Sequence, residues 1–179
     1  MMYLNGYERL HVLIEIRDER PDDIATVREV NRRAFGQEQE SNIVDALRTN
    51  GGVLLSLVAI MDDRAIGHII YSPVSVGDMV KGAALGPIAV LPEHQRQGIG
   101  SKLVEAGNRK MKDPGYPFII VVGHAEYYPR FGFRPASQYG IKCEWDLPDD
   151  VFMVRILDLA KMQGVYGLAK YRDEFSTVC

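Results

Sequence analysis

The sequence predicts a mixed α/β domain, and three patterns along the chain point to it. Two alternating runs, residues 54–60 and 64–76, flank Asp62-Asp63 and predict an antiparallel hairpin. Apolar runs at 82–90 and 118–122 stand on either side of a helical pattern, which predicts a βαβ unit with two parallel strands and a right-handed crossover. A chain of 179 residues, 46% of them hydrophobic, suits one domain with a full core.

The N-terminal third predicts one strand and two helices. Residues 11–17 alternate and are β-branched, as in a strand. Residues 20–35 place a proline at the start of a helical repeat, and residues 40–51 repeat the pattern and end at a glycine. The inward positions of the two predicted helices are Ile24, Val27, Val30 and Ala34, then Ile43, Val44 and Leu47.

The rest of the chain predicts a strand-rich second half. Gly86-Pro87 interrupts the strand at 82–90 and predicts a bulge. A helix follows to about residue 112, with Leu103, Gly107 and Met111 on its inner face. We expect a short helix ending at Gly132, then strands at 133–145 and 151–157 that close the sheet. Residues 164–171 predict one more strand.

Composition and charge exclude several classes of protein. The net charge of −3 argues against nucleic acid as a partner, since that needs a basic face, and leans toward a cationic substrate. No apolar run is long enough to span a membrane, and the N-terminus has no signal-peptide core, so we expect a cytoplasmic protein. Two distant cysteines, Cys143 and Cys179, form no metal-ligand pattern and predict reduced thiols and no bound metal.

Residues 95–101, QRQGIGS, predict an anion site. They lie between a predicted strand and a predicted helix, where free backbone N–H groups point at a ligand. Arg96 adds a guanidinium suited to phosphate, and Ser101 adds a hydroxyl. The spacing fails the nucleoside-triphosphate template, and Leu103 stands where a dinucleotide loop needs its third glycine.

A third template, Q/R-x-x-G-x-G/A, matches residues 95–100, and a second motif lies downstream. There Tyr128 is followed four residues later by Gly132-Phe133. The stretches LGPIAVLPEHQRQGIGSKLVEAG and YYPRFGFRPAS together closely resemble the GNAT superfamily of acetyl-CoA-dependent N-acetyltransferases, in its YhbS-like branch. The resemblance runs from about residue 13 to residue 157 and into the C-terminal 164–171.

This resemblance implies a fold and a co-substrate. The fold is a twisted mixed sheet of about six or seven strands with about four helices, in which the parallel pair splays apart to admit acetyl-CoA. It implies an acetyltransferase domain at 10–160 and an extension at 161–179 that adds a strand. It also implies a set of acetyl-CoA-binding residues: Ile88, Ala89 and Val90 along the pantetheine arm, and Gln95, Arg96, Gln97, Gly98, Gly100 and Ser101 around the pyrophosphate.

The implied chemistry is direct attack of a primary amine on acetyl-CoA in a ternary complex. The departing thiolate benefits from a proton, and the resemblance assigns Tyr128 as this general acid. His124 is a candidate base that stands where many relatives carry aspartate. Glu38 and Glu40 are family-level candidates for the acceptor groove, whereas Tyr127 and Trp145 are expected to be packing residues.

Two functions and several acceptors stay open on the sequence alone. The alternative to an enzyme is a non-catalytic acyl-CoA-binding regulatory module, and the presence of Tyr128 favours the enzyme. The acceptor is a small amine, an amino acid, an antibiotic-like amine or a protein amine. A homodimer through the C-terminal strand is a further expectation.

Overall fold

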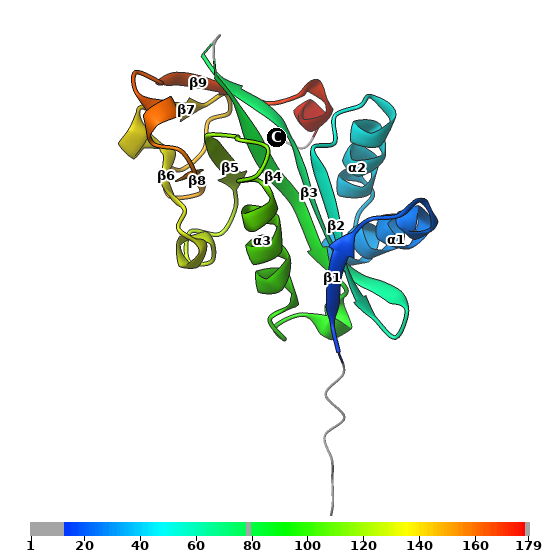
Figure 1. The fold of residues 1–179 in the computed structure, drawn as a ribbon. Helices are drawn as coiled ribbons and strands as arrows, with labels where there is room; N and C mark the ends of the chain where they lie inside the picture. The colour runs from blue at the N-terminus through cyan, green and yellow to red at the C-terminus, as the bar shows by residue number, and fades with distance from the viewer. Residues whose placement is uncertain (1–12, 78–79, 178–179) are drawn as a thin grey trace, which may run out of the picture.

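The computed structural model describes residues 13–77 and 80–177, which fold around one strongly twisted sheet (Figure 1). Seven strands follow the order β1-β2-β3-β4-β5-β8-β6, and β9 joins at the side by pairing with β3 and β7. The strands are β1 (Glu15–Asp18), β2 (Leu55–Met61), β3 (Arg64–Val76), β4 (Val80–Val90), β5 (Phe118–Val122), β6 (Arg134–Pro135), β7 (Ile141–Cys143), β8 (Phe152–Ile156) and β9 (Gly167–Lys170). The α-helices are α1 (Ile24–Phe35), α2 (Gln39–Thr49) and α3 (Ile99–Lys110).

Helices cover both faces of the sheet. Leu103 and Val104 of α3 pack with Leu57 and Ala59 of β2 on one face. Alternate residues of the same strand, such as Val58, point to the other face, where α1 and α2 supply the partners. In Figure 1, α3 lies in front of the long strands and α1 and α2 lie to their right.

The predicted hairpin is confirmed, with Asp62 and Asp63 as its two turn residues. Both have positive φ, 48° and 59°, a conformation that aspartate tolerates better than most residues and that a tight hairpin turn requires. This turn sets β2 and β3 antiparallel, with Met61 opposite Arg64.

The parallel pair splays apart, as expected. β4 and β5 are paired only from Ala83–Ile119 to Leu85–Val121, although β4 continues to Val90. At the point of divergence the β3–β4 register shifts, because Gly86 and Pro87 together occupy the space opposite Ile70. The predicted bulge is therefore present, and it marks the place where the second half of β4 loses its β5 neighbour.

Several local predictions were wrong. The strand expected at 133–145 is two short strands separated by a 3-10 turn, Ala136–Tyr139, and the short helix ending at Gly132 is a single 3-10 turn, Tyr128–Phe131. Because of these breaks, the described residues contain nine strands and three α-helices, where about six or seven strands and about four helices were predicted. Ile24, predicted to face inward, is the first residue of α1 and is 42% exposed. Residues 11–12 and Cys179 lie outside the described residues, and Cys143 is a free cysteine.

The C-terminal segment returns to the centre of the molecule. β9 pairs antiparallel with the end of β3, where Val76 lies opposite Ala169. The last 3-10 helix, Asp173–Thr177, then packs on α2, and Phe175 contacts the core between α1, α2 and the sheet. This return brings aromatic residues beside the gap between β4 and β5.

Candidate active site

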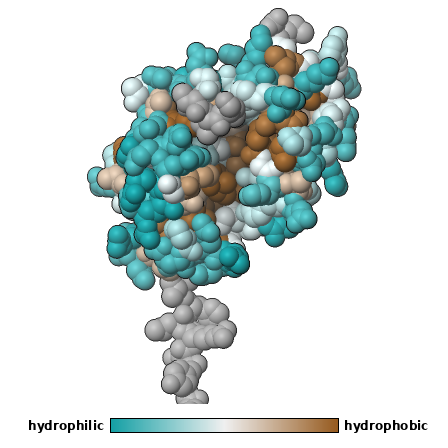
Figure 2. Space-filling view, turned by 180° about the vertical axis from the view of Figure 1, so that it is seen from behind, coloured by the Kyte–Doolittle hydropathy of each residue, from teal (hydrophilic) through white to brown (hydrophobic). Residues whose placement is uncertain are grey.

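A cavity of about 680 Å³ opens where β4 and β5 separate. Seen from behind, the molecule is hollowed between two lobes, and hydrophobic residues line the hollow (Figure 2). The lining residues come from both helical layers and from the C-terminal segment. They are Phe35, Glu40, Ile43, Leu85, Gly86, Pro87, Ile88, Val90, Gln95, Arg96, Gly100, Val122, Gly123, His124, Tyr127, Tyr128, Trp145, Tyr171 and Phe175.

The glycine loop forms one end of this cavity. Arg96 and Gly98 both have left-handed backbone, with φ of 58° and 81°, so the N–H groups of the loop curve toward one point. Gly98 is the N-cap of α3, and no side chain caps the helix. The first intrahelical bond runs from the Lys102 N–H to the Gly98 carbonyl, so the N–H groups of Ile99 to Ser101 remain available to an anion.

A second recess of about 430 Å³ adjoins the loop and contains Gly98, Ser101, Tyr127 and Arg130. A Cβ placed on Gly100 would lie 3.0 Å from the Tyr127 hydroxyl, so this phenol reaches the helix N-terminus. The Arg130 guanidinium stacks 4.6 Å above the Tyr127 ring. The prediction that Tyr127 is only a packing residue was wrong, because the turn that leads into the 3-10 helix places its hydroxyl beside the glycine loop.

The edge of β4 offers backbone groups to the cavity. The Leu91 N–H donates to the Ile66 carbonyl on β3, so by strand alternation Ala89 also pairs toward β3. The N–H and C=O groups of Ile88 and Val90 therefore point to the side that β5 has left. The Gln95 side chain donates to the Val90 carbonyl at 3.0 Å. Ala89, 2% exposed, does not line the cavity.

The predicted loop residues divide into two groups. Gln95, Arg96 and Gly100 line the main cavity, and Gly98 and Ser101 line the recess beside it. Gln97 lines neither of these two spaces, and its side chain donates to the Glu93 carbonyl at 3.2 Å.

Tyr128 is buried in the wall of the cavity, 5% exposed. Its ring meets Tyr127 and Phe133 edge to face, with centroids 5.0 and 5.6 Å apart. Burial, with a smaller contribution from Tyr127, raises the pKa of the Tyr128 phenol well above its usual range. The Tyr128 phenol is therefore protonated at neutral pH, so it can act as a proton donor but not as a base.

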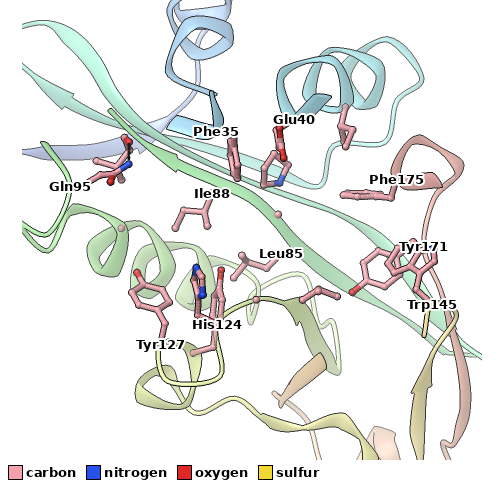
Figure 3. Close-up of a pocket in the computed structure, with 18 of the residues that line it drawn as sticks. Phe35, Glu40, Leu85, Ile88, Gln95, His124, Tyr127, Trp145, Tyr171 and Phe175 are labelled. Atoms are coloured by element: carbon pink, nitrogen blue, oxygen red, sulfur yellow. Dashed lines mark hydrogen bonds between the residues drawn. The ribbon is translucent and has the colours of Figure 1, made fainter. Parts of the chain in front are cut away.

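His124 and Glu40 face the cavity from opposite sides (Figure 3). His124 follows β5 and is exposed, and its carbonyl accepts the N–H groups of Tyr127 and Tyr128. Glu40 lies in the first turn of α2 and is only 9% exposed. Glu38, the other glutamate expected there, is exposed and pairs with Arg28 outside the cavity.

Three aromatic residues form the end of the cavity opposite the glycine loop. In Figure 3, Gln95 lies at one end, Trp145, Tyr171 and Phe175 at the other, and Ile88 and Leu85 between them. Trp145 follows β7 in a bend, so the prediction that it is a packed strand residue was wrong. Aromatic spacing in the sequence carries no signal for this wall, because its residues come from separate segments.

Residues 13–77 and 80–177 provide neither a cluster of metal ligands nor a membrane-crossing helix. No group of three or more His, Cys, Asp or Glu in that part of the chain could hold a metal ion. No helix there is long and apolar enough to cross a membrane.

A sheet split beside a glycine-rich helix N-terminus, with a buried tyrosine at the split, defines a GNAT acetyltransferase. The family model described as "Acetyltransferase (GNAT) domain" matches residues 15–136. The chain belongs to this family and is an acyltransferase of the N-acetyltransferase type.

Relatives span nearly the whole chain. It is 32% identical to the uncharacterized N-acetyltransferase YhbS of Escherichia coli K12 over 163 residues, 90% of this chain and 98% of that protein. The crystal structure of Escherichia coli YhbS in complex with CoA superposes with a TM-score of 0.88 and covers 93% of each chain. A GNAT acetyltransferase from Brucella melitensis in complex with acetyl-CoA is 35% identical, with a TM-score of 0.77, and covers 92% of this chain and 99% of that one.

Proposed function

We propose that this protein binds acetyl-CoA in the gap between β4 and β5 and transfers its acetyl group to a primary amine. The single observation that carries the proposal is the split parallel pair, which opens directly beside the uncapped N-terminus of α3. Relatives that share the fold and about a third of the sequence were crystallised with CoA and with acetyl-CoA, which supports the same co-substrate here.

The residues present fit such a ligand. A Cβ on Gly98 would meet nothing within 4 Å, so this side of the loop is open to a bulky group. The N–H groups of residues 98–101, with the Arg96 guanidinium and the Ser101 hydroxyl, would hold the pyrophosphate. The edge of Ile88 and Val90 that β5 has left would hydrogen-bond the pantetheine amides, as another strand would, beside the Val90 carbonyl that already accepts the Gln95 side chain. Gln97 would contribute its backbone N–H alone.

Bound acetyl-CoA supplies an acetyl group activated as a thioester. In the reaction the amine nitrogen bonds to the acetyl carbon, the carbon–sulfur bond breaks, and the amine loses a proton. Tyr128 donates a proton to the departing sulfur, because its phenol lines the cavity wall and is protonated at neutral pH. A β4 N–H at Ile88 or Val90 donates to the carbonyl oxygen as negative charge develops on it.

His124 is the proposed acceptor of the amine proton. Its ring lines the cavity on the side of Tyr127 (Figure 3), and it is exposed, so the proton can pass on to solvent. A neutral imidazole accepts a proton near pH 7. His124→Gln is expected to shift the acid limb of the pH–rate profile, which a purely structural role would leave in place.

We further propose that residues 161–177 belong to the catalytic unit and are not a separable extension, because Tyr171 and Phe175 line the same cavity. A truncation after residue 160 is expected to lose acceptor binding. The cytoplasmic location and the homodimer that the sequence suggests stay predictions.

The central test is release of free CoA thiol from acetyl-CoA with a panel of primary amines. Tyr128→Phe should retain acetyl-CoA binding, measured by thermal shift, and lose about 10²- to 10⁴-fold in kcat. Tyr166→Phe is the matched control, since Tyr166 is 74% exposed and does not line the cavity. Equal turnover by both variants would remove the proton-donor role. Tight acetyl-CoA binding with no amine turned over would favour the regulatory module instead.

A further inference from the structure

Glu40 is an acidic side chain in the cavity wall that forms no ion pair among the described residues. The Glu40 residue is 9% exposed, and its carboxylate accepts hydrogen bonds from the neutral Gln37 side chain, at 3.1 and 3.2 Å. Within residues 13–77 and 80–177, no Lys, Arg or His lies within ion-pair distance of it. Other acids on the same helical layer are paired: Glu38 and Asp45 both bind Arg28. A buried carboxylate facing a cavity is stabilised by a cation that enters it.

The cavity wall near Glu40 is built for an apolar body. Trp145 packs against Tyr171 with centroids 4.7 Å apart, and Tyr171 packs against Phe175 at 5.6 Å. Ile43 and Phe35 line the α1–α2 side, and Phe35 is 41% exposed, which is unusual for a phenylalanine. The aromatic end therefore offers apolar surface in the same cavity as the Glu40 side chain.

The donor and this surface occupy different ends of one cavity. The glycine loop and the β4 edge from Val90 to Ile88 lie toward Gln95, and the aromatic wall lies beyond Leu85 (Figure 3). A thioester that follows β4 away from the loop points its acetyl group toward the wall formed by Tyr128. A second substrate then approaches from the aromatic end, with Glu40 on its flank.

We propose that the acceptor is a small primary amine with a cationic head and an aromatic or similarly bulky apolar body. Glu40 binds the ammonium, and Trp145, Tyr171 and Phe175 bind the body. The inference rests on the acetyl transfer proposed above. Amines that carry a carboxylate next to the amino group are excluded, because that charge would meet Glu40 with no cation between them. Loss of one ammonium proton precedes attack, as for any amine in this reaction.

Three amines that differ by one group test the inference. 2-Phenylethylamine has the proposed head and body, ethylamine lacks the ring, and phenylalanine adds a carboxylate. We expect kcat/KM for 2-phenylethylamine to exceed that for ethylamine by about 100-fold, from burial of the ring, and that for phenylalanine by about 10-fold or more. Equal use of the three amines, or better use of a lysine-containing peptide, would overturn the proposal.

Substitutions of Glu40 and Trp145 test the separate roles proposed for the carboxylate and the aromatic wall in acceptor binding. Glu40→Gln keeps the shape of the side chain and should raise KM for 2-phenylethylamine by about 10- to 100-fold, with KM for acetyl-CoA unchanged and the exclusion of phenylalanine relaxed. Glu38→Gln removes a nearby exposed carboxylate outside the cavity and should change neither constant. Trp145→Ala should erase the preference over ethylamine. An unchanged KM in Glu40→Gln would contradict the role of Glu40.

Binding without turnover separates this inference from the proposed function. Calorimetry measures 2-phenylethylamine binding to the protein saturated with CoA, so no reaction is needed. If the wild type binds the amine and Glu40→Gln does not, the inference stands even where no acetyl group is transferred. If acetyl transfer proceeds to short or anionic amines alone, the proposed function stands and the inference falls.

Discussion

Gly123 and Tyr128 are packed so closely that no side chain fits between them. A Cβ on Gly123 would lie 2.3 Å from Cε2 of the Tyr128 ring, well inside van der Waals contact. Gly123 follows the last residue of β5, so its missing side chain lets the buried phenol lie against the end of that strand. The glycine thus positions the proposed acid.

Gly123→Ala is expected to push the Tyr128 ring out of place and lower kcat by about 10- to 100-fold. Acetyl-CoA binding depends mainly on the loop and β4, so its Kd should not change. Steady-state kinetics and a thermal shift with acetyl-CoA separate the two effects. A Gly123→Ala variant with wild-type kcat would show that turnover does not depend on the exact position of the Tyr128 phenol.

Gly98→Glu should abolish acetyl-CoA binding, since it puts a carboxylate where the pyrophosphate is proposed to lie. Gly36→Glu is a matched control. Both glycines have left-handed backbone, φ 81° and 73°, and a Cβ on either meets nothing within 4 Å. Gly36 lies at the end of α1 and does not line the cavity. Both variants should lose about 1–2 kcal/mol of stability, and only Gly98→Glu should lose stabilisation by acetyl-CoA.

A chain of polar side chains crosses the core at His68, which is fully buried. The Asn31 amide N–H group donates to the Val27 carbonyl and to Nδ1 of His68, so Nδ1 is the unprotonated nitrogen. The Nε2–H then donates to the Ser56 hydroxyl at 2.9 Å, and Ser56 donates to Glu19. The contact between the Asn31 amide and Nδ1 requires a neutral imidazole, because a protonated Nδ1 could not accept this hydrogen bond.

Burial, and secondarily the charge of Arg48, lowers the pKa of His68 to about 3. The unfolded chain protonates this histidine near its ordinary pKa of about 6.5, so stability present above that pH is lost as the pH falls toward 3. At pH 4.5 the loss is about 2–3 kcal/mol. Urea unfolding between pH 7 and 4.5 should show this slope in the wild type and a smaller one in His68→Gln. Identical slopes would contradict the assignment.

Gly107→Ala is expected to change stability in two opposite ways, because alanine has a higher helix propensity but its side chain would clash with the core. In an exposed helix the change stabilises by about 1 kcal/mol, but here a Cβ would lie 2.4 Å from the Tyr71 hydroxyl and 2.5 Å from its ring. Tyr71 is fully buried in the core cluster, so its ring cannot swing out to solvent. We expect a net loss of about 1–3 kcal/mol in urea unfolding. A gain in stability would show that α3 can shift away from the sheet.

Patterns within one segment predicted much of the fold. The alternation of β2 and β3, the bulge at Gly86-Pro87 and the apolar run of β5 each depend on neighbouring residues, and each was confirmed. Residues 133–145 were misassigned because β6 and β7 are too short to show a period, and they are held by partners elsewhere in the sheet.

In the candidate active site, short sequence motifs determine some features and tertiary packing determines others. The glycine loop and the Tyr128 motif are readable in the sequence, because free N–H groups at a helix start and a tyrosine at fixed spacing are properties of short segments. Three other features of the site cannot be read from the sequence. They are the contact of Tyr127 with the Gly100 backbone region, the burial of Glu40, and the aromatic wall of Trp145, Tyr171 and Phe175. These depend on which distant segments fold against one another, so only the tertiary structure decided them. The sequence therefore determines the family and the donor loop, and the packing decides what the acceptor meets.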